Sequence, residues 1–291
     1  MGNLKEAMYY EKLPDSIVKC VLCPHNCVIS PGGIGICGVR KNIEGVLYSM
    51  IYEKVSSIAF DPIEKKPLYK FHPGTYILSA GSVGCNFRCP FCQNYSIART
   101  APDMVETTTI TSSQLVSKAL SLKDQGNIGI AYTYNEPTIW YEYVYDTARL
   151  AKEKGLLNVL VTNGFINPEP LENLLPYIDA MNIDLKGYSE GFYRDVVKGR
   201  LESVKNTIQM AAGKCHVEVT TLVIPGLNDS AEEMVEMAKW LASISPDIPL
   251  HLSRFFPKYM MQDRPMTPMK TLSELHGIAS EYLNNVYMGN V

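Results

Sequence analysis

The spacing of the cysteines constrains this chain more strongly than any other feature. Seven of the eight cysteines fall into two tight groups, within residues 20–37 and 85–92. In a chain of 291 residues whose first ten show no apolar signal segment, grouped thiols are typical of metal binding and not of a disulfide framework. The eighth cysteine, Cys215, stands alone before an apolar run, and we interpret it as a buried structural thiol.

The overall charge and hydropathy argue against two classes of partner. The formal net charge is -3, and the Lys and Arg residues are scattered along the chain, so it lacks the basic patch that nucleic acid requires. No apolar run approaches the roughly 20 residues that cross a bilayer. We therefore expect a cytoplasmic protein that binds neither nucleic acid nor a membrane.

From about residue 75 onward, short β-rich runs alternate with amphipathic stretches, which is the pattern of repeated βα units around a parallel sheet. Strands are predicted at residues 75–81, 128–134, 158–163, 180–185, 216–224 and 249–255. The helical stretch between Pro137 and Gly155 has the expected proline at its start and glycine at its end. Because six βα units are too few to close a full barrel, we predict an α/β fold with a partial, TIM-like (βα)6 barrel over residues 71–291.

Residues 1–70 differ in composition, being rich in Cys, Gly and Pro and ending in DPIEKKP at residues 61–67, which we interpret as a linker. They contain a set of four thiols, at Cys20, Cys23, Cys27 and Cys37. Four ligands leave no open position on a metal, which indicates a structural or electron-transfer role. Zinc, with His25 as a competing ligand, and a second [4Fe-4S] cluster both suit this set. Metal-free thiols suit it less, because so small a region lacks a core. We predict a cysteine-rich metal-binding appendage.

The second group of cysteines directly follows the first predicted barrel strand, at the end where barrel enzymes carry their chemistry. Its spacing is Cys85-x3-Cys89-x2-Cys92. Three thiolates can hold three irons of a [4Fe-4S] cubane and leave the fourth iron open, whereas electron-transfer clusters normally use four. The spacing therefore indicates a reactive cluster. A zinc knuckle or reduced core thiols are the alternatives.

The segment GCNFRCPFCQN, which includes Phe91 and Asn94, resembles the signature of the radical S-adenosylmethionine (SAM) superfamily. With CVLCPHNC, GICGVRKN, DPIEKKPLYKFHPG, YTYNEPT and NIDLKG, nearly the whole chain resembles the AmmeMemoRadiSam radical SAM proteins, relatives of the pyruvate formate-lyase activating enzymes. The resemblance implies a partial barrel and a [4Fe-4S] cluster on Cys85, Cys89 and Cys92. It also implies reductive cleavage of SAM to methionine and a 5′-deoxyadenosyl radical that abstracts hydrogen.

The same resemblance assigns SAM contacts to the ends of successive strands. Glu136 would contact the SAM amino group, Lys186 its carboxylate and His251 its ribose. The residues that the resemblance places beside the cofactor are Phe91, Asn94, Asn135, Glu136, Thr162, Asn163, Asp184, Lys186, Leu222 and His251. Other interpretations stay open for three of these positions. Asp184 and Lys186 lie on one strand face and can pair with each other, and His251 can be a core histidine.

Two departures from the family limit what is carried over. Val161 stands where the activating enzymes have an acid that helps to bind a cation, so that cation site is not carried over to this chain. The related proteins continue past the equivalent of residue 290 into a cysteine-bearing tail, whereas this sequence stops at Val291, and whether it is shortened stays open.

The resemblance implies a radical SAM enzyme that works under anaerobic conditions, with an electron donor such as flavodoxin or ferredoxin, although the residues do not identify the donor. The resemblance does not imply a substrate. A protein target and a small molecule are both open hypotheses, and a third is a non-catalytic iron-sulfur or zinc protein.

Overall fold

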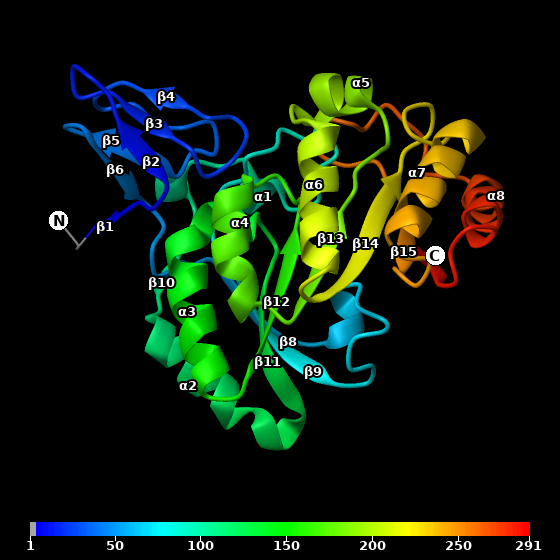
Figure 1. Ribbon diagram of the computed structural model, residues 1–291, viewed down its shortest axis with the longest axis horizontal. Helices are drawn as coiled ribbons and strands as arrows, with labels where there is room; N and C mark the ends of the chain where they lie inside the picture. Colours follow the sequence, from blue (N-terminus) through cyan, green and yellow to red (C-terminus); the bar gives the residue numbers. More distant parts are fainter. Residues whose placement is uncertain (1–3) are drawn as a thin grey trace.

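The computed structural model describes residues 4–291, and its central feature is a twisted eight-stranded sheet (Figure 1). The strand order is β16-β15-β14-β13-β12-β11-β9-β8. All neighbours pair in parallel except β8 and β9, which pair antiparallel. The strands are β8 (Ser57–Pro62), β9 (Tyr76–Gly81), β11 (Asn127–Tyr132), β12 (Leu157–Thr162), β13 (Ala180–Asp184), β14 (His216–Val223), β15 (Leu250–Arg254) and β16 (Val286–Gly289).

The six strands predicted from sequence are all confirmed, each to within two residues at either end. The edge strands β8 and β16 were not predicted. Residues 61–67, which we expected to be a linker, complete β8 and form the short 3-10 helix η1 (Ile63–Lys65). The strand β8 could not be recognised in the sequence because it lies at the edge of the sheet, with a neighbour on one side only. Its residues do not alternate between buried and exposed, so they lack the periodicity that identifies a strand.

Helices connect the parallel strands and cover one side of the sheet (Figure 1). The helix α2 begins with a capping box, in which the Thr111 hydroxyl and the Gln114 side chain each accept a hydrogen bond from the other residue's backbone N–H. The α-helices are α1 (Tyr95–Ala98), α2 (Ser112–Ser121), α3 (Tyr141–Glu153), α4 (Pro168–Leu174), α5 (Glu190–Phe192), α6 (Leu201–Ala212), α7 (Ala231–Ile244) and α8 (Met269–Ser280). The other helical turns are η2 (Pro102–Met104), η3 (Lys123–Gln125), η4 (Pro137–Trp140), η5 (Leu175–Tyr177) and the π-helical η6 (Tyr193–Val197). No helix in residues 4–291 is both long and apolar enough to cross a membrane.

The N-terminal region forms two small antiparallel sheets beside the main one (Figure 1). Their orders are β1-β6-β5 and β2-β3-β4. The strands are β1 (Lys5–Glu6), β2 (Tyr10–Lys12), β3 (Val18–Cys20), β4 (Val28–Ile29), β5 (Arg40–Ile43) and β6 (Val46–Ser49). Farther along, β7 (Lys54–Val55) pairs with β10 (Thr108–Thr109).

The segment after η1 closes the other side of the sheet, and Glu218 of β14 holds it there. The Glu218 carboxylate accepts hydrogen bonds from the backbone N–H groups of Tyr69 and Lys70 at 3.0 and 2.7 Å. It also contacts the Nε2 atoms of His216 and His251 at 2.9 and 2.6 Å. Burial alone would raise the pKa of Glu218, but the imidazoles and the two N–H groups lower it to about 2.

Replacing Glu218 by Gln should lower the free energy of unfolding by about 3 kcal/mol at pH 7, because the pKa shift from 4.5 to about 2 stabilises the folded state. The folded-state pKa is the lower one, so this contribution is complete above pH 4.5 and is lost as the pH falls toward 2. Urea denaturation should therefore show a smaller difference in the free energy of unfolding between wild type and Glu218→Gln at pH 3 than at pH 7. Glu236→Gln, at a side chain 67% exposed, is the control. Equal differences at both pH values would contradict this account.

Candidate functional site

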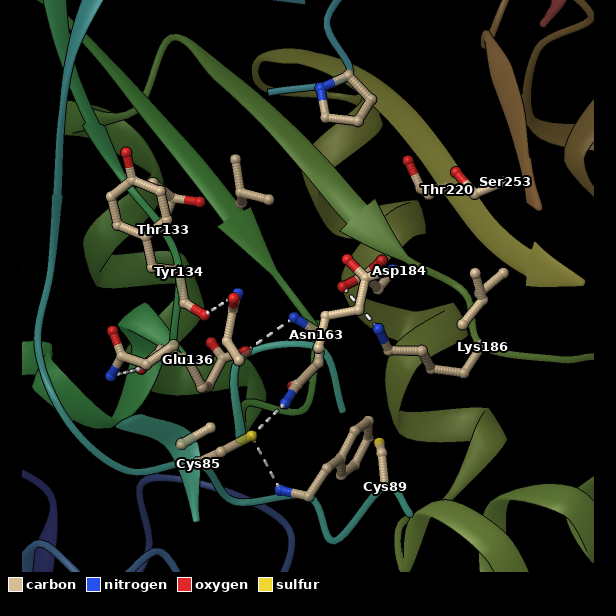
Figure 2. Close-up of a pocket in the computed structure, with 18 of the residues that line it drawn as sticks. Cys85, Cys89, Thr133, Tyr134, Glu136, Asn163, Asp184, Lys186, Thr220 and Ser253 are labelled. Atoms are coloured by element: carbon tan, nitrogen blue, oxygen red, sulfur yellow. Dashed lines mark hydrogen bonds and ion pairs between the residues drawn. The ribbon is translucent and has the colours of Figure 1, made fainter. Parts of the chain in front are cut away.

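A cavity of about 400 Å³ opens where the parallel strands end (Figure 2). The loop after β9 and the ends of β11, β12 and β13 surround it, since the carboxyl ends of parallel strands meet at one edge of a sheet. Ten of the predicted site residues line the cavity, namely Cys85, Cys89, Phe91, Asn94, Asn135, Glu136, Asn163, Asp184, Lys186 and Leu222.

The loop that carries Cys85, Cys89 and Cys92 is fixed by Asn135, which follows β11. The Asn135 side-chain oxygen accepts a hydrogen bond from the Ser82 N–H at 2.9 Å, and its amide donates to the carbonyls of residues 83 and 84 at 3.2 Å. The Cys92 N–H donates to the Cys89 carbonyl at 3.3 Å, which makes the turn between these two thiols. Burial raises the pKa of the Cys89 thiol to about 12, so metal binding at this loop must release protons.

The carboxylate of Glu136 joins the ends of two strands. Its Oε1 accepts hydrogen bonds from the Thr138 N–H at 2.9 Å and the Thr162 hydroxyl at 2.7 Å, and its Oε2 accepts one from the Asn163 N–H at 2.8 Å. Burial raises the pKa of Glu136, and these three donors oppose the rise. Both oxygens therefore already have partners in the protein, so a contact with a ligand ammonium would be an additional one.

Asn163 connects this carboxylate to the first cysteine. Its amide nitrogen lies 3.6 Å from Cys85 Sγ (Figure 2). The same nitrogen lies 2.8 Å from the side-chain oxygen of Asn86. Its side-chain oxygen accepts a hydrogen bond from the Phe165 N–H at 2.9 Å. An amide donor at a metal-bound sulfur both orients the ligand and stabilises its negative charge. The Thr-Asn-Gly turn after β12 thus positions the Cys85 side chain.

Lys186 and Asp184 form an ion pair at the cavity wall, with Nζ and Oδ2 2.8 Å apart (Figure 2). The two side chains therefore pair with each other in the structure, as the alternative interpretation of the sequence proposed. Burial would lower the pKa of Lys186, but Asp184 and the nearby thiols raise it above its usual value. The cavity wall consequently carries a fixed ammonium with an acidic neighbour.

Three of the residues predicted for the cluster and SAM site do not line the cavity. Cys92 lies beside it, within the same turn as Cys89. Thr162 lies behind Glu136, to which its hydroxyl donates. The Nε2 of His251 contacts Glu218, and the ring packs edge-on against Tyr69 at 4.8 Å between centroids. The predicted contact between His251 and the ribose gains no support from this arrangement.

Sequence reasoning missed other parts of the wall, among them Lys66, Tyr134 and Ser253. Lys66 is buried, with its Nζ 2.9 Å from Asp61 Oδ2 and 5.0 Å from the centre of the Tyr134 ring. Tyr134 has a φ of 72°, an unusual value for an aromatic residue and one that marks functional sites in many proteins. The segment DPIEKKP was the only signal for Lys66, and its prolines and charges resemble those of a solvated linker.

Cys85, Cys89 and Cys92 are free thiols on the loop after β9. Three thiols on one loop suit a cubane, in which each thiolate binds a separate iron. Cys20, Cys23, Cys27 and Cys37 line a second cavity in the N-terminal region.

Comparison with known proteins identifies relatives over most of the chain. The profile of the Radical SAM superfamily matches residues 80–241. An uncharacterized protein of Methanocaldococcus jannaschii is 45% identical over 291 residues, which span 99% of this chain and 86% of that protein. A putative glycyl-radical enzyme activating enzyme of the same organism is 30% identical over 222 residues, which span 72% of this chain and 86% of that protein.

A solved structure shows the same fold. The crystal structure of a radical SAM methyltransferase from Sphaerobacter thermophilus superposes with a TM-score of 0.56 at 17% identity. The match covers 75% of this chain and 67% of that one. At this identity the likeness concerns the arrangement of the strands and helices alone.

Gly84, directly before Cys85, should tolerate no side chain. A Cβ there would lie 2.6 Å from Val39 Cγ1 and 2.9 Å from the Cys37 carbonyl oxygen, at a φ of 89°. Gly74 is a matched control, because its φ is 80° but a Cβ would meet nothing within 4 Å. Gly74→Ala should lower the free energy of unfolding by about 1 kcal/mol, and Gly84→Ala by at least about 2 kcal/mol more. Equal losses in urea denaturation would contradict the close contact.

Proposed function

The chain belongs to the radical SAM superfamily and is an enzyme related to the glycyl-radical and pyruvate formate-lyase activating enzymes; from this premise we propose that Cys85, Cys89 and Cys92 hold a [4Fe-4S] cluster that binds SAM. When bound, the cluster would supply the electron that splits the S–C5′ bond of SAM into methionine and a hydrogen-abstracting 5′-deoxyadenosyl radical. The protein would hold the target C–H bond in reach of that carbon and exclude water.

The main support for this proposal is that the three-thiol loop and the ion pair of Asp184 and Lys186 border the same cavity. Cys85 and Cys89 face the same space as Asp184 and Lys186 (Figure 2). Three thiols leave one iron of a cubane without a protein ligand. A cavity of about 400 Å³ falls within the range of small-molecule sites. The amino and carboxylate groups of SAM are ligands that such an iron could take.

The charged residues of the wall suggest how SAM would be oriented. Lys186 would donate to the SAM carboxylate, since an ammonium and a carboxylate form a strong charge-assisted hydrogen bond. Asp184 would then be free to accept a hydrogen bond from the ribose. Glu136 would attract the SAM ammonium, although its oxygens also accept bonds from the protein. The other proposed cofactor contacts are Phe91, Asn94, Asn135, Thr162, Asn163 and Leu222.

The proposed function also implies a division of the chain into a barrel and an appendage. We assign residues 71–291 to a partial (βα)6 barrel and residues 1–70 to a metal-binding appendage, although β8 (Ser57–Pro62) already pairs with the main sheet. The metal of the appendage would be zinc or a second [4Fe-4S] cluster. A one-electron donor such as flavodoxin or ferredoxin would reduce the enzyme.

For the target we propose a protein. A relative 30% identical is named a putative glycyl-radical enzyme activating enzyme. Beside the cysteine loop, the Met260 N–H donates to the Pro90 carbonyl while the Met260 side chain is 72% exposed. We assign this exposed side chain to the contact with the protein target. A small-molecule target is the alternative, as is a non-catalytic iron-sulfur or zinc protein.

The decisive test is the formation of 5′-deoxyadenosine by anaerobically reconstituted protein with dithionite and SAM. The wild type should form 5′-deoxyadenosine and methionine in equal amounts, and Cys89→Ala should form neither. Cys215→Ala is the matched control, because it removes a cysteine far from both groups along the chain and should leave the product unchanged. Wild-type protein that carries a [4Fe-4S] cluster but forms no 5′-deoxyadenosine would contradict the proposed function and favour the non-catalytic alternative.

A further inference from the structure

The cavity that contains the cysteine loop has a second end, which is lined by residues 65–67, Thr133 and Tyr134. None of these residues is assigned to the cluster or to SAM. In Figure 2, Thr133 and Tyr134 lie away from Cys85 and Cys89. A molecule bound at this end would share the cavity with SAM without competing for the three thiols.

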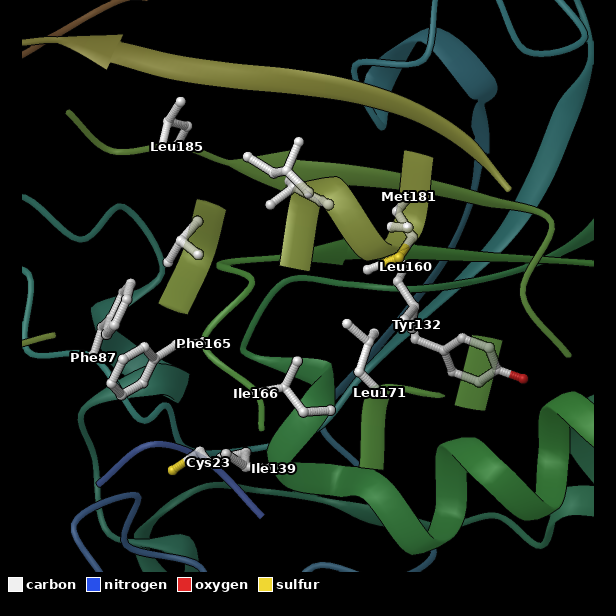
Figure 3. Packing of buried hydrophobic residues seen from close by; sticks show 14 of the residues in the cluster. Cys23, Phe87, Tyr132, Ile139, Leu160, Phe165, Ile166, Leu171, Met181 and Leu185 are labelled. Atoms are coloured by element: carbon white, nitrogen blue, oxygen red, sulfur yellow. The ribbon is translucent and has the colours of Figure 1, made fainter. Parts of the chain in front are cut away.

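The cavity lies on the inner face of the sheet, and packed side chains fill the helix-covered face. Leu160 of β12 and Met181 of β13 are buried there among other apolar side chains (Figure 3). Val161, the next residue of β12, lines the cavity instead, because successive side chains of a strand point to opposite faces. The molecule on which the radical acts would therefore share the inner face with SAM.

The segment after β8 holds Lys66 in place at the second end of the cavity. The Lys66 N–H donates to the Ile63 carbonyl at 2.9 Å, and the Asn182 side-chain amide donates to the Pro67 carbonyl at 2.8 Å. A proline also restricts the backbone of the residue before it. The Lys66 side chain, which lines the cavity, is therefore positioned before any ligand binds. This lowers the conformational entropy that binding would cost.

The Lys66 ammonium keeps hydrogen-bonding capacity for a ligand. A lysine has three N–H donors, and Lys66 is only 3% exposed. Within residues 4–291 its Nζ has one acceptor, Asp61 Oδ2 at 2.9 Å, and the centre of the Tyr134 ring lies 5.0 Å away. The Tyr134 hydroxyl donates to the same carboxylate at 3.0 Å, which fixes the ring beside it. A further acceptor on the cavity side would complete the surroundings of this buried ammonium.

The charges at this end favour an anion. Asp61 pairs with two lysines, because Lys65 Nζ lies 3.3 Å from its Oδ1 and Lys66 Nζ 2.9 Å from its Oδ2. Two ammonium groups and one carboxylate leave one net positive charge. Burial lowers the pKa of Lys66, Asp61 opposes this, and Lys65 adds to it. A bound anion would therefore stabilise the charged form of Lys66.

We propose that Lys66 and Thr133 bind a carboxylate group of the target molecule. The inference rests on the proposed function, because it concerns the molecule on which the radical acts. Thr133 is 6% exposed and lines the cavity, and its hydroxyl makes no hydrogen bond within residues 4–291. An ammonium and a hydroxyl together can donate to both oxygens of one carboxylate.

Two other anionic groups match this end less well. The single carboxylate of SAM is assigned to Lys186 beside the cysteines, which leaves Lys66 for a different molecule. A phosphate ester carries a charge of about -1.5 to -2 at pH 7, more than the one net positive charge here can balance. Glu136 and Asp184 also border the cavity and would repel it. A singly charged carboxylate fits these charges.

The reacting C–H bond would lie close to this carboxylate, since both must fit beside SAM in a cavity of about 400 Å³. In the protein target proposed above, the group would be an acidic side chain, and a free carboxylic acid shares its chemistry. The 5′-deoxyadenosyl radical would take one hydrogen atom from a carbon of this group. It would become 5′-deoxyadenosine and leave the unpaired electron on that carbon.

Calorimetric titration of the reconstituted full chain with SAM present tests the subsite. The probes are acetyl-Gly-Glu-Gly-amide and its neutral isostere acetyl-Gly-Gln-Gly-amide. The wild type should bind the acidic peptide at least about 10-fold more tightly, the effect of one charge-assisted hydrogen bond. Lys66→Gln should abolish this preference. Lys70→Gln is the matched control and should keep it, because Lys70 is an exposed lysine of the same segment that does not line the cavity.

Wild-type protein that binds both peptides equally, or neither at about 10 mM, would overturn the inference, whether or not Lys66→Gln folds. Glutarate, titrated in parallel, separates the two sources of a carboxylate. Tighter binding of glutarate than of the acidic peptide, again lost in Lys66→Gln, would support the subsite and assign it to a small molecule instead of a protein.

The position of the reacting bond is tested with the acidic peptide deuterated on the β and γ carbons of its glutamate. With dithionite and SAM, the wild type should transfer deuterium into 5′-deoxyadenosine, which mass spectrometry detects. Lys66→Gln should lower the deuterated fraction, whereas Lys70→Gln should not. Bound peptide and 5′-deoxyadenosine that never contains deuterium would overturn the placement of the carboxylate beside the reacting carbon. Absence of any 5′-deoxyadenosine would instead contradict the proposed function.

Discussion

The hydrogen bonds of the buried Glu136 carboxylate are the contacts on which the site depends. They join the turn after β11 to the backbone and hydroxyl groups at the end of β12. A carboxylate at this depth would be strongly unfavourable without its donors, so its charge and the shape of both turns stabilise each other. Through Asn163 the same connection reaches Cys85. The position of the first thiol therefore follows from the pairing of strands that are far apart in the sequence.

The parallel sheet explains why polar groups can gather at one end while the other end stays packed. On the inner face, Ile63, Leu68 and Ala131 form part of a separate apolar cluster, and Glu218 anchors the segment that covers it. Toward the carboxyl ends, the inward positions of the strands become polar or small and leave room for a ligand. Because side chains alternate between the two faces of each strand, this change along the inner face leaves the packing of the helix-covered face in place.

Much of this arrangement could be predicted from the sequence, because inner parallel strands are continuous apolar runs between capped helices. The order of thiols, acids and amides at successive strand ends also identified ten of the residues that line the cavity. The partners of Glu136 could not be predicted, since they depend on strand register. Lys66 was missed because only Asp61 and Tyr134, folded around it, distinguish it from a solvated lysine. The contact between His251 and Glu218 could not be predicted, because Glu218 lies on the neighbouring strand.

The central claim is that SAM binds directly to an iron that these three thiols leave open, next to Lys186 and Glu136. Electron-nuclear double resonance on the reduced protein tests this most directly, with SAM carrying ¹⁵N in its amino group and ¹⁷O in its carboxylate. The account predicts hyperfine coupling of both labels to the cluster on Cys85, Cys89 and Cys92. A reduced [4Fe-4S] signal that responds to SAM without coupling to either label would contradict it.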